Sequence, residues 1–346
     1  MDKNSFLSKL CLLIFCGLSS FGWSQQETIF SLYRYHLNLQ NPAAIGLVEA
    51  EQAVLSVRSQ WLGVADAPET QALTFFVPSP SSRLHKGFTL MNDQTFVERQ
   101  TQLTIDFAYT LPLGGEKNIY LGLKVGANNV TLNASHLATY QSTDSDPSLF
   151  DRSGFVPNLG AGFHYQSHRF YFAASIPHLL NTERFALKNE RVALATDRPH
   201  VYLNSAYRFS LTQDWEFIPT LLYTAVKGAP SSTQLDLLMH YQNRFELGPL
   251  YNFQNGIGAS LGINIAHAFH LAYAYTARVG NQSSQFSSGS HEIALRFRLD
   301  DPKAVAPNRT SNPLFSKSKE RDIKENLSEQ KNNEINNISN DKVNDL

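Results

Sequence analysis

Cysteine is almost absent from this sequence. Its two cysteines, Cys11 and Cys16, both fall within the first 24 residues. That stretch has the features of a secretory signal peptide, with Lys3 and Lys9 ahead of a short apolar run and small residues before a cleavage point after Ser24. The alternative, a buried N-terminal helix, has no amphipathic face to support it. A mature chain without thiols excludes a disulfide-stapled fold, thiol catalysis and thiolate metal sites.

Charge and long apolar runs are scarce as well. Charged residues make up 17% of the chain and the formal net charge is -1, so no bulk electrostatic attraction to nucleic acid is expected. After the signal peptide there is no run of about 18 apolar residues, and we expect no transmembrane helix. The fingerprints Gly-x-Ser-x-Gly, His-Glu-x-x-His, the P-loop and the dinucleotide-binding motif are all missing. We therefore expect a protein that is not an enzyme and holds no cofactor.

What the chain does contain is alternation with a period of two. In "TQLTIDFAYTL" (101–111), every second residue is apolar, which is the pattern of a strand with one apolar face. Further examples occur at 119–128, 257–265, 269–279 and 291–299. Between Gln52 and Leu299 such runs predict about 14 antiparallel strands of roughly 8–12 residues, the length that a tilted strand needs to cross a bilayer. Short turns are predicted at Gly114–Lys117, Gln166–Arg169 and Gln242–Arg244, and longer connections at Asn133–Val156 and Pro177–His200.

The second face of these strands is poor in lysine, which a water-facing surface normally carries in number. Between Glu51 and Asp300 there are five: Lys86, Lys117, Lys124, Lys188 and Lys227. That face is built instead from Gly, Ala, Ser, Thr and Asn, as in a crowded polar barrel interior. Aromatic residues near predicted strand ends fit the girdles of a membrane barrel; they are Trp61, Phe75, Trp215, Phe245 and Tyr251. We expect an all-β outer-membrane barrel; an exported soluble β protein is the alternative.

The predicted organisation has four parts. Residues 1–24 are the signal peptide, 25–51 an N-terminal periplasmic segment, 52–300 the outer-membrane β-barrel and 301–346 a disordered polar tail. The tail is rich in Asn, Lys and Glu and cannot bury enough apolar surface to offset its ordering entropy. It is either a solvated terminus or an arm that binds a partner. An even strand count places both termini in the periplasm.

A few polar residues are of types that can form metal sites. Four histidines lie at or beside predicted turns: His164, His168, His267 and His270. We interpret them as solvated rather than as metal ligands, because strand and turn geometry does not bring them together. Asp144, Asp146 and Asp151 share a long loop, but no calcium-loop pattern is complete.

Several arginines sit at positions that fit the lumen: Arg58, Arg208, Arg278, Arg296 and Arg298. They would either steer anions or, as is more common, pair with interior acids such as Asp106, Asp236 and Glu292. No metal site is expected.

Several separated motifs resemble the PorP/SprF family of the type IX secretion system of Bacteroidetes. They are "LNLQNPAAIG" (37–46), "RSQWLGVADAPETQ" (58–71), "KGFTLMNDQ" (86–94), "DSDPSLF" (144–150), "PNLGAGFHYQSHRFYFAASIPHLLN" (157–181), "RPHVYLNSAYRF" (198–209) and "SSGSHEIALRFRL" (287–299). Together they cover roughly residues 30–300. The signature positions are Asn41, Pro42, Arg58, Gln60, Trp61, Gly63, Ala67, Pro68, Thr70, Gln71, Asn92 and Asp93.

Within this signature, residues 58–71 also have a physical interpretation as a strand end, a turn and a strand start. Gly63 permits the bend, Pro68 sits where no ladder hydrogen bond is lost, and Trp61 suits a membrane interface. A turn alone does not need so many specified residues, so docking is a second possible role for them.

The resemblance implies a non-enzymatic outer-membrane component that helps particular secreted cargo proteins, including gliding-motility adhesins, to reach or stay on the cell surface. The implied partners are cargo C-terminal domains, periplasmic and outer-membrane secretion components and the lipid bilayer. The implied mechanism is a membrane-fixed receptor with a plugged or narrow lumen. The alternative function is a channel for uptake of small solutes.

Overall fold

The computed structural model describes residues 29–79, 82–133, 151–184, 195–242, 244–254, 256–266, 268–277 and 289–299. The predicted signal peptide and the polar tail from 301 onward lie outside these residues. So do Asp144, Asp146, His267 and Arg278.

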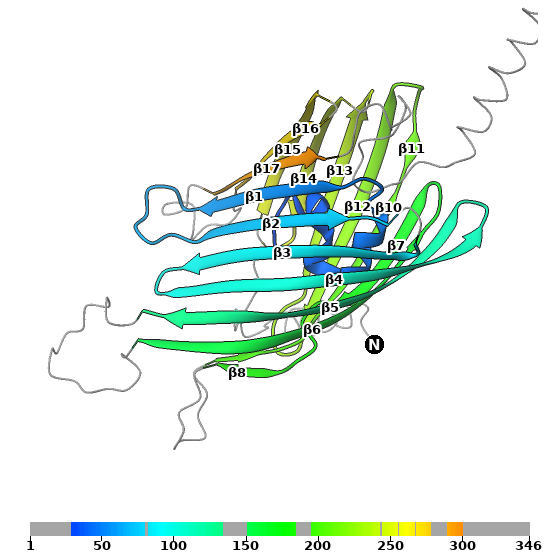
Figure 1. Cartoon of the computed structure of the whole chain (residues 1–346). Coiled ribbons are helices and arrows are strands. Elements are labelled where there is room, and N and C mark those ends of the chain that lie inside the picture. The colour runs from blue at the N-terminus through cyan, green and yellow to red at the C-terminus, as the bar shows by residue number, and fades with distance from the viewer. Residues whose placement is uncertain are drawn as a thin grey trace, which may run out of the picture.

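The chain forms a closed antiparallel barrel of 14 strands, as predicted (Figure 1). β1 pairs with β17 and closes the ring. Two short segments, β10 and β11, both pair with β12 and together make one of the 14. The barrel strands are β1 (Gln52–Gln60), β2 (Glu69–Val77), β3 (Leu84–Thr95), β4 (Glu98–Gly114), β5 (Lys117–Leu132), β6 (Arg152–Gln166), β7 (Phe170–Ile176), β10 (His200–Tyr207), β11 (Phe209–Ser210), β12 (Trp215–Val226), β13 (Ser232–Tyr241), β14 (Phe245–Asn252), β15 (Gly256–Ala266), β16 (Phe269–Ala277) and β17 (Ser290–Arg298). A separate hairpin joins β8 (Thr182–Arg184) to β9 (Ala195–Asp197).

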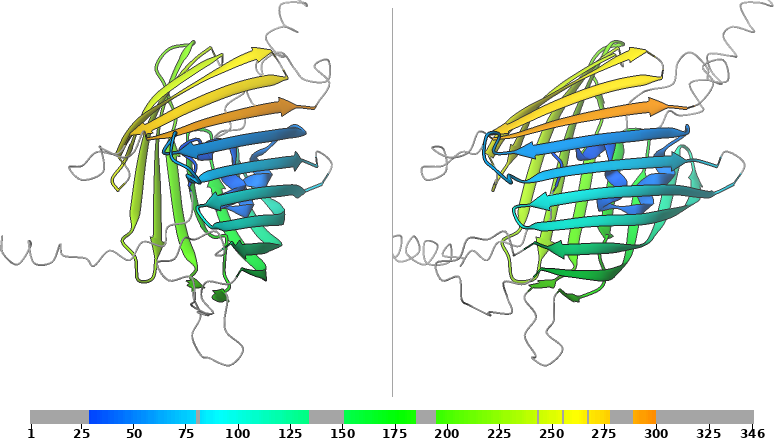
Figure 2. Two further views of the ribbon diagram at one scale, coloured as in Figure 1. Left: turned by 90° about the vertical axis from the view of Figure 1, so that its left-hand side faces the viewer. Right: turned by 60° about the vertical axis from the view of Figure 1, so that its left-hand side comes forward.

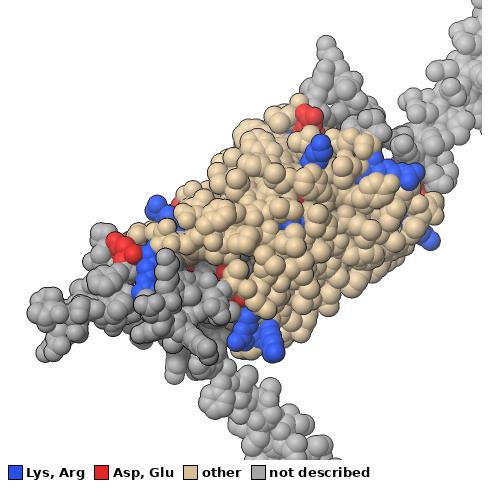
Figure 3. Space-filling view, turned by 60° about the horizontal axis from the view of Figure 1, so that its bottom comes forward, with Lys and Arg blue, Asp and Glu red and all other residues tan. Residues whose placement is uncertain are grey.

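Burial in the barrel is the reverse of burial in a water-soluble protein. The apolar residues of each strand point outward and are exposed, for example Leu103, Ile105 and Tyr109 of β4. Their neighbours Gln102, Thr104 and Asp106 point inward and are buried. Figure 3 shows the consequence, since the outer wall is largely free of charged side chains, which gather towards the two ends. An apolar band around a polar interior is the arrangement of an outer-membrane barrel and not of an exported soluble β protein.

The two ends of the barrel differ (Figure 2). The terminal end carries the start of β1, the end of β17 and the short turns at 114–117, 166–170 and 241–245. There the N–H of Leu299 donates to the carbonyl of Glu51. The loop end carries the turn at 61–68 and the strand ends that flank the longer connections, at Leu132 and Arg152, Ile176 and His200, and Ala277 and Ser290. The three predicted short turns all lie at the terminal end.

The N-terminal segment is where the fold departs from the predicted organisation. The sequence predicts a periplasmic segment at 25–51, but residues 29–48 lie inside the lumen. Residues 29–48, called the plug below, contain three short helices, η1 (Tyr33–Tyr35), α2 (Leu37–Gln40) and η2 (Pro42–Leu47). In Figures 1 and 2 they are the blue coils enclosed by the strands. None of the helices among the described residues is long and apolar enough to cross a membrane.

Candidate functional site: a plugged lumen

The plug fills a space that barrel geometry creates. The interior of a barrel of about eight strands is filled by the side chains of the strands, whereas barrels of 16 to 18 strands enclose an aqueous channel. A barrel of 14 strands therefore needs added mass to close its lumen. Phe30, Leu32, Tyr33, Tyr35 and Ile45 of the plug are each at most 3% exposed. They pack against inward-facing residues of both halves of the barrel.

Glycines in the wall make room for the plug at the motif "NPA". A Cβ added to Gly122 of β5 would lie 2.0 Å from the backbone nitrogen of Ala43, and one added to Gly162 of β6 would lie 1.9 Å from the Asn41 amide oxygen. The Asn41 side chain also caps η2, accepting from the Ala43 N–H at 3.0 Å, and it donates to the carbonyl of Phe163. The signature residue Asn41 thus has a structural role in seating the plug.

Glu292 of β17 holds the plug near the loop end. Its two carboxylate oxygens accept the backbone N–H groups of Ser31 and Leu32 at 2.8 and 2.9 Å. The same carboxylate forms an ion pair with Arg58 of β1, whose Nε lies 2.8 Å away. One buried acid therefore satisfies two plug amides and the arginine of the signature.

A second buried acid, Glu246 of β14, holds the plug towards the terminal end. The Arg34 guanidinium lies 2.6 Å from its carboxylate, with both side chains at most 4% exposed. Tyr35 donates its hydroxyl hydrogen to Glu246 and lies 2.6 Å from Nε2 of His270. Burial works to lower the pKa of Arg34, but the adjacent Glu246 carboxylate outweighs it and raises that pKa, so Arg34 stays charged. For Tyr35, burial and then Glu246 raise the pKa, so the phenol stays protonated.

Two uncharged polar side chains of the plug, His36 and Asn38, hold its middle. His36 sits between the hydroxyl groups of Thr74 and Ser56, at 3.0 and 2.8 Å. Asn38 donates to Asp106 of β4, which is also paired with Lys124 of β5 at 3.0 Å. Burial alone lowers the pKa of His36 from 6.5 to about 3. His36 is therefore neutral in the docked plug at neutral pH.

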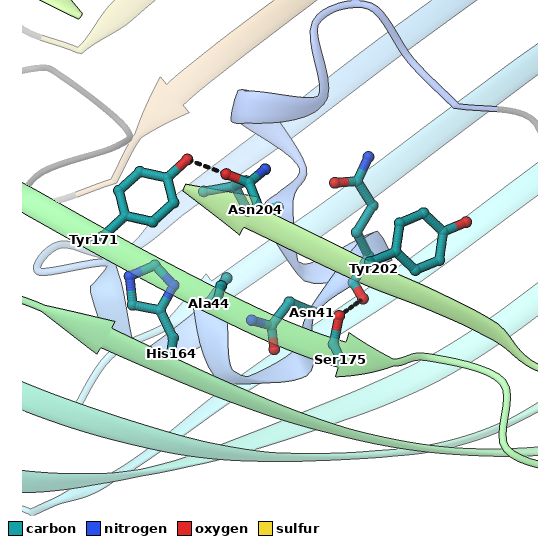
Figure 4. A pocket seen from close by; sticks show the side chains of 10 residues that line it. Asn41, Ala44, His164, Tyr171, Ser175, Tyr202 and Asn204 are labelled. Atoms are coloured by element: carbon teal, nitrogen blue, oxygen red, sulfur yellow. Dashed lines mark hydrogen bonds between the residues drawn. The ribbon is translucent and has the colours of Figure 1, made fainter. Parts of the chain in front are cut away.

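Little space remains between plug and wall. Figure 4 shows a pocket between α2, η2 and strands β6, β7 and β10, lined among others by His164, Tyr171 and Asn204. Its volume is about 10 Å³, room for about one water molecule. Tyr171 donates to Asn204 across it, and Ser175 donates to the carbonyl of Gln40. This pocket is too small for a larger ligand.

The neutrality of His36 leads to a prediction about pH. A released plug exposes His36 with its ordinary pKa of 6.5, so protons bind the released form below that pH and favour it. Plug docking should weaken by about 2 kcal/mol from this group between pH 6.5 and pH 5, at roughly 1.4 kcal/mol per pH unit. We expect more frequent channel openings in planar bilayers at pH 5 than at pH 7.5. The variant His36→Gln, which keeps a donor and an acceptor, should lose that part of the pH dependence; an unchanged pH dependence in this variant would contradict the assignment.

The signature residues fall into two groups in space. Asn41, Pro42 and Arg58 belong to the plug and its contacts, as described above. The remaining ones lie at the loop end: Gln60, Trp61, Gly63, Ala67, Pro68, Thr70, Gln71, Asn92 and Asp93.

At the loop end the turn has the conformation that the sequence predicts. β1 ends at Gln60 and β2 begins at Glu69. Gly63 has φ +92° and Trp61 has φ +51°. The Gln60 N–H donates to the carbonyl of Pro68, and Thr70 donates to Asp93 at 2.5 Å. The Trp61 ring packs on Phe96 of the next hairpin with centroids 5.9 Å apart. Docking at these residues stays a prediction.

The histidine interpretation is wrong for two of the described residues. His164 and His270 are 2% and 4% exposed and face the lumen, where they contact Gln166 and Tyr35. His164 lies near the end of β6 and His270 near the start of β16. Both positions are beside turns, but their side chains face the lumen rather than solvent. His168 does sit at a turn and lies 3.1 Å from Glu116. Within the described residues no group of three His, Cys, Asp or Glu side chains is arranged to hold a metal ion.

The predicted pairing of interior arginines is confirmed for Arg58, whose partner is Glu292. Asp106 pairs with Lys124 instead, and Asp236 accepts from Gln234 at 2.9 Å. Arg34 and Glu246 were missed. The clue available was an arginine between two tyrosines in "LYRYHLNLQ", a charge placed in an otherwise uncharged aromatic stretch.

Comparison with known proteins identifies the family. The model of the type IX secretion system membrane protein PorP/SprF matches residues 23–297. The chain belongs to the PorP/SprF family. The match spans the plug and the whole barrel, so both are part of what the family model describes. The protein is accordingly a type IX secretion component of the outer membrane. No curated protein sequence matches the chain.

Comparison with solved structures finds distant similarities to this PorP/SprF member. Omp33 of Acinetobacter baumannii is 11% identical with a TM-score of 0.43, covering 73% of this chain and 100% of that one. A FadL homologue of Pseudomonas aeruginosa is 10% identical with a TM-score of 0.41, covering 75% of this chain and 93% of that one. The toluene transporter TodX of Pseudomonas putida is 10% identical with a TM-score of 0.42, covering 80% of this chain and 93% of that one. These likenesses concern the fold alone.

Proposed function

We propose that this protein is a membrane-fixed receptor that assists secretion or surface attachment of specific cargo proteins. Family membership supports a role in type IX secretion. The observation that carries the receptor mechanism is the filled lumen. The ion pair of Arg34 with Glu246 and the hydrogen bonds from the Ser31 and Leu32 amides to Glu292 hold the plug across it. A barrel closed in this way holds surfaces in the membrane rather than passing solutes. No catalytic role is assigned to any residue.

The proposal also includes orientation and partners. In outer-membrane barrels the short turns and termini face the periplasm and the longer connections face outward. The loop end would then meet cargo through its C-terminal domain, and the terminal end, with the segment beyond residue 300, would meet periplasmic secretion components. Adhesins used in gliding are one class of cargo that fits a surface receptor.

Deletion of the protein is the direct test. We expect a small set of secreted proteins to disappear from the cell surface while other outer-membrane proteins keep their abundance, as measured by surface proteomics. The full-length tagged protein, solubilised in mild detergent, should recover the same set by pull-down. An unchanged surface proteome would overturn the proposal.

The alternative function, an uptake channel for small solutes, is distinguished from the receptor by measuring conductance. The receptor predicts that the intact barrel in planar bilayers is closed most of the time. A steady open conductance or rapid solute flux into liposomes would favour the channel, and it would require the plug to leave the lumen.

A further inference from the structure

Within the part of the chain that the structure describes, strand β6 has an edge at the loop end with no hydrogen-bonded strand, called the free edge below. β5 pairs with β6 along its whole length, from Asn118 opposite Gln166 to Leu132 opposite Arg152. On the other side, β7 pairs only with residues 161–166, and one further hydrogen bond joins the N–H of Leu179 to the carbonyl of Leu159. Among the described residues, the stretch 153–157 therefore has a hydrogen-bonded strand on one side only. β8 approaches β6 on the other side but pairs with β9 and not with β6. Figure 1 shows this end of β6 projecting past β8.

The direction of the free backbone groups follows from the register. Along a strand, N–H and C=O groups of alternate residues point to the same side. The carbonyl of Leu159 points towards β7, so those of Ser153, Phe155 and Pro157 point to the same, open side. Pro157 has no N–H, and proline is tolerated in strands where it faces an open edge. The open side thus presents two N–H groups, of Ser153 and Phe155, and three carbonyls.

The side chains of this edge are also open. Phe155 is 75% exposed, and a Cβ added to Gly154 would meet nothing within 4 Å. β6 has 15 residues, whereas about 9–11 suffice to cross a bilayer. Unpaired backbone groups are not tolerated in hydrocarbon, so this end of β6 must stand beyond it, at the loop end.

We infer that the free edge of β6 binds an extended segment of a secreted partner as an added β-strand. A row of alternating donors and acceptors is complemented by another strand, and the alternate side chains supply specificity. A residue with an apolar or β-branched side chain would pair opposite Phe155. The identity of the partner as secreted cargo rests on the proposed function.

Two other occupants are less suited to this edge. The chain that follows Leu299 begins at the terminal end, beside Glu51, and the bilayer separates it from this edge. A second copy in the same membrane would bring its own β6 edge, which also lacks the donor at Pro157. If two β6 edges paired with each other, each would lack the N–H of Pro157, and a carbonyl on each edge would be left without a donor.

A photo-crosslinking residue in place of Phe155, in the full-length protein in its own cells, tests this inference. We expect a cross-link to a segment of a protein that the deletion also removes from the surface. The added change Ser153→Pro removes one edge donor without touching the β5 ladder, and it should lower the cross-link yield about five- to tenfold. Ser153→Ala keeps the donor and should leave the yield unchanged. The same crosslinker at Leu247, exposed on the lipid-facing wall near the terminal end, is the position control.

The outcomes separate this inference from the proposed function. A cross-link to a second copy of the chain, or to no protein, would overturn the edge as the docking site. So would an equal cross-link yield with Ser153→Pro, provided that the variant barrel is folded, as shown by a gel band that shifts on heating. If those results come with an intact pull-down of cargo by the parent protein, the receptor function stands. If the parent recovers no cargo and its deletion changes no surface protein, the receptor function fails instead.

Discussion

Replacement of Glu246 with glutamine should release the plug more than any other single change described for this molecule. Arg34 would be left charged and buried without its carboxylate, and loss of one partner of a buried ion pair typically costs about 3–5 kcal/mol. Protein lacking residues 1–24 has no native thiol, so Ala44→Cys, at a plug residue 4% exposed, is a unique reporter. Its labelling by a maleimide should accelerate by roughly 100-fold or more, at 1.4 kcal/mol per factor of ten.

Two further variants make the test specific. Glu69→Gln changes an exposed acid whose side chain accepts from Gln71, and it should leave the labelling rate unaltered. The double variant Arg34→Met with Glu246→Met replaces the pair by apolar side chains of similar length and should recover much of the protection. Slow labelling in Glu246→Gln would mean that the plug is held chiefly elsewhere, with Glu292 as the next residue to change.

A methyl group at Gly122 should unseat the plug from the opposite wall. The added Cβ would meet backbone atoms of Pro42 and Ala43 at 2.0 to 2.6 Å, and backbone cannot rotate aside as a flexible side chain does. Overpacking of this kind costs typically about 1–3 kcal/mol. We expect Gly122→Ala to open the barrel in planar bilayers about 10- to 100-fold more often than the parent, with Gly162→Ala acting in the same direction.

Gly154→Ala is the matched control, because a methyl group there meets nothing within 4 Å. It should leave the opening frequency unchanged. The folded barrel, seen as a gel band that shifts on heating, should persist in all three glycine variants. The added methyl groups at Gly122 and Gly162 meet atoms of the plug, and the one at Gly154 meets nothing within 4 Å. Openings that stay rare in Gly122→Ala and Gly162→Ala would show that docking of the "NPA" segment does not need the space left by these two glycines.

The barrel could be predicted from the sequence because its signal is local and repeated. Alternation in stretches such as 101–111 depends only on a strand having lipid on one side and a polar lumen on the other. The scarcity of lysine on the inward face distinguished that lumen from a water-facing surface. The turns at 114–117, 166–170 and 241–245 carry their own residue signals. Each of these inferences needs no knowledge of distant parts of the chain.

The plug could not be predicted in this way because its contacts join residues far apart in the sequence. "LYRYHLNLQNPAAIG" has no regular period, and its helices have between three and six residues. Its stability comes from wall residues such as Glu246, Glu292 and Gly122, which lie on three different strands. The same cause misled the interpretation of His164 and His270, whose burial depends on what occupies the lumen. Only inward-facing glycines at 122 and 162 hinted that backbone approaches closely there.

The placement of Glu292 also has a consequence for the order of assembly. This residue lies on β17, the last strand to be made, yet it binds the amides of Ser31 and Leu32, which precede it by 261 and 260 residues. It also binds Arg58 on β1, the strand with which β17 closes the ring. The seam is therefore completed by the same carboxylate that captures the plug. A barrel that closed around an empty lumen would leave this carboxylate short of two donors, so correct closure is itself a check that the amino-terminal segment is already inside.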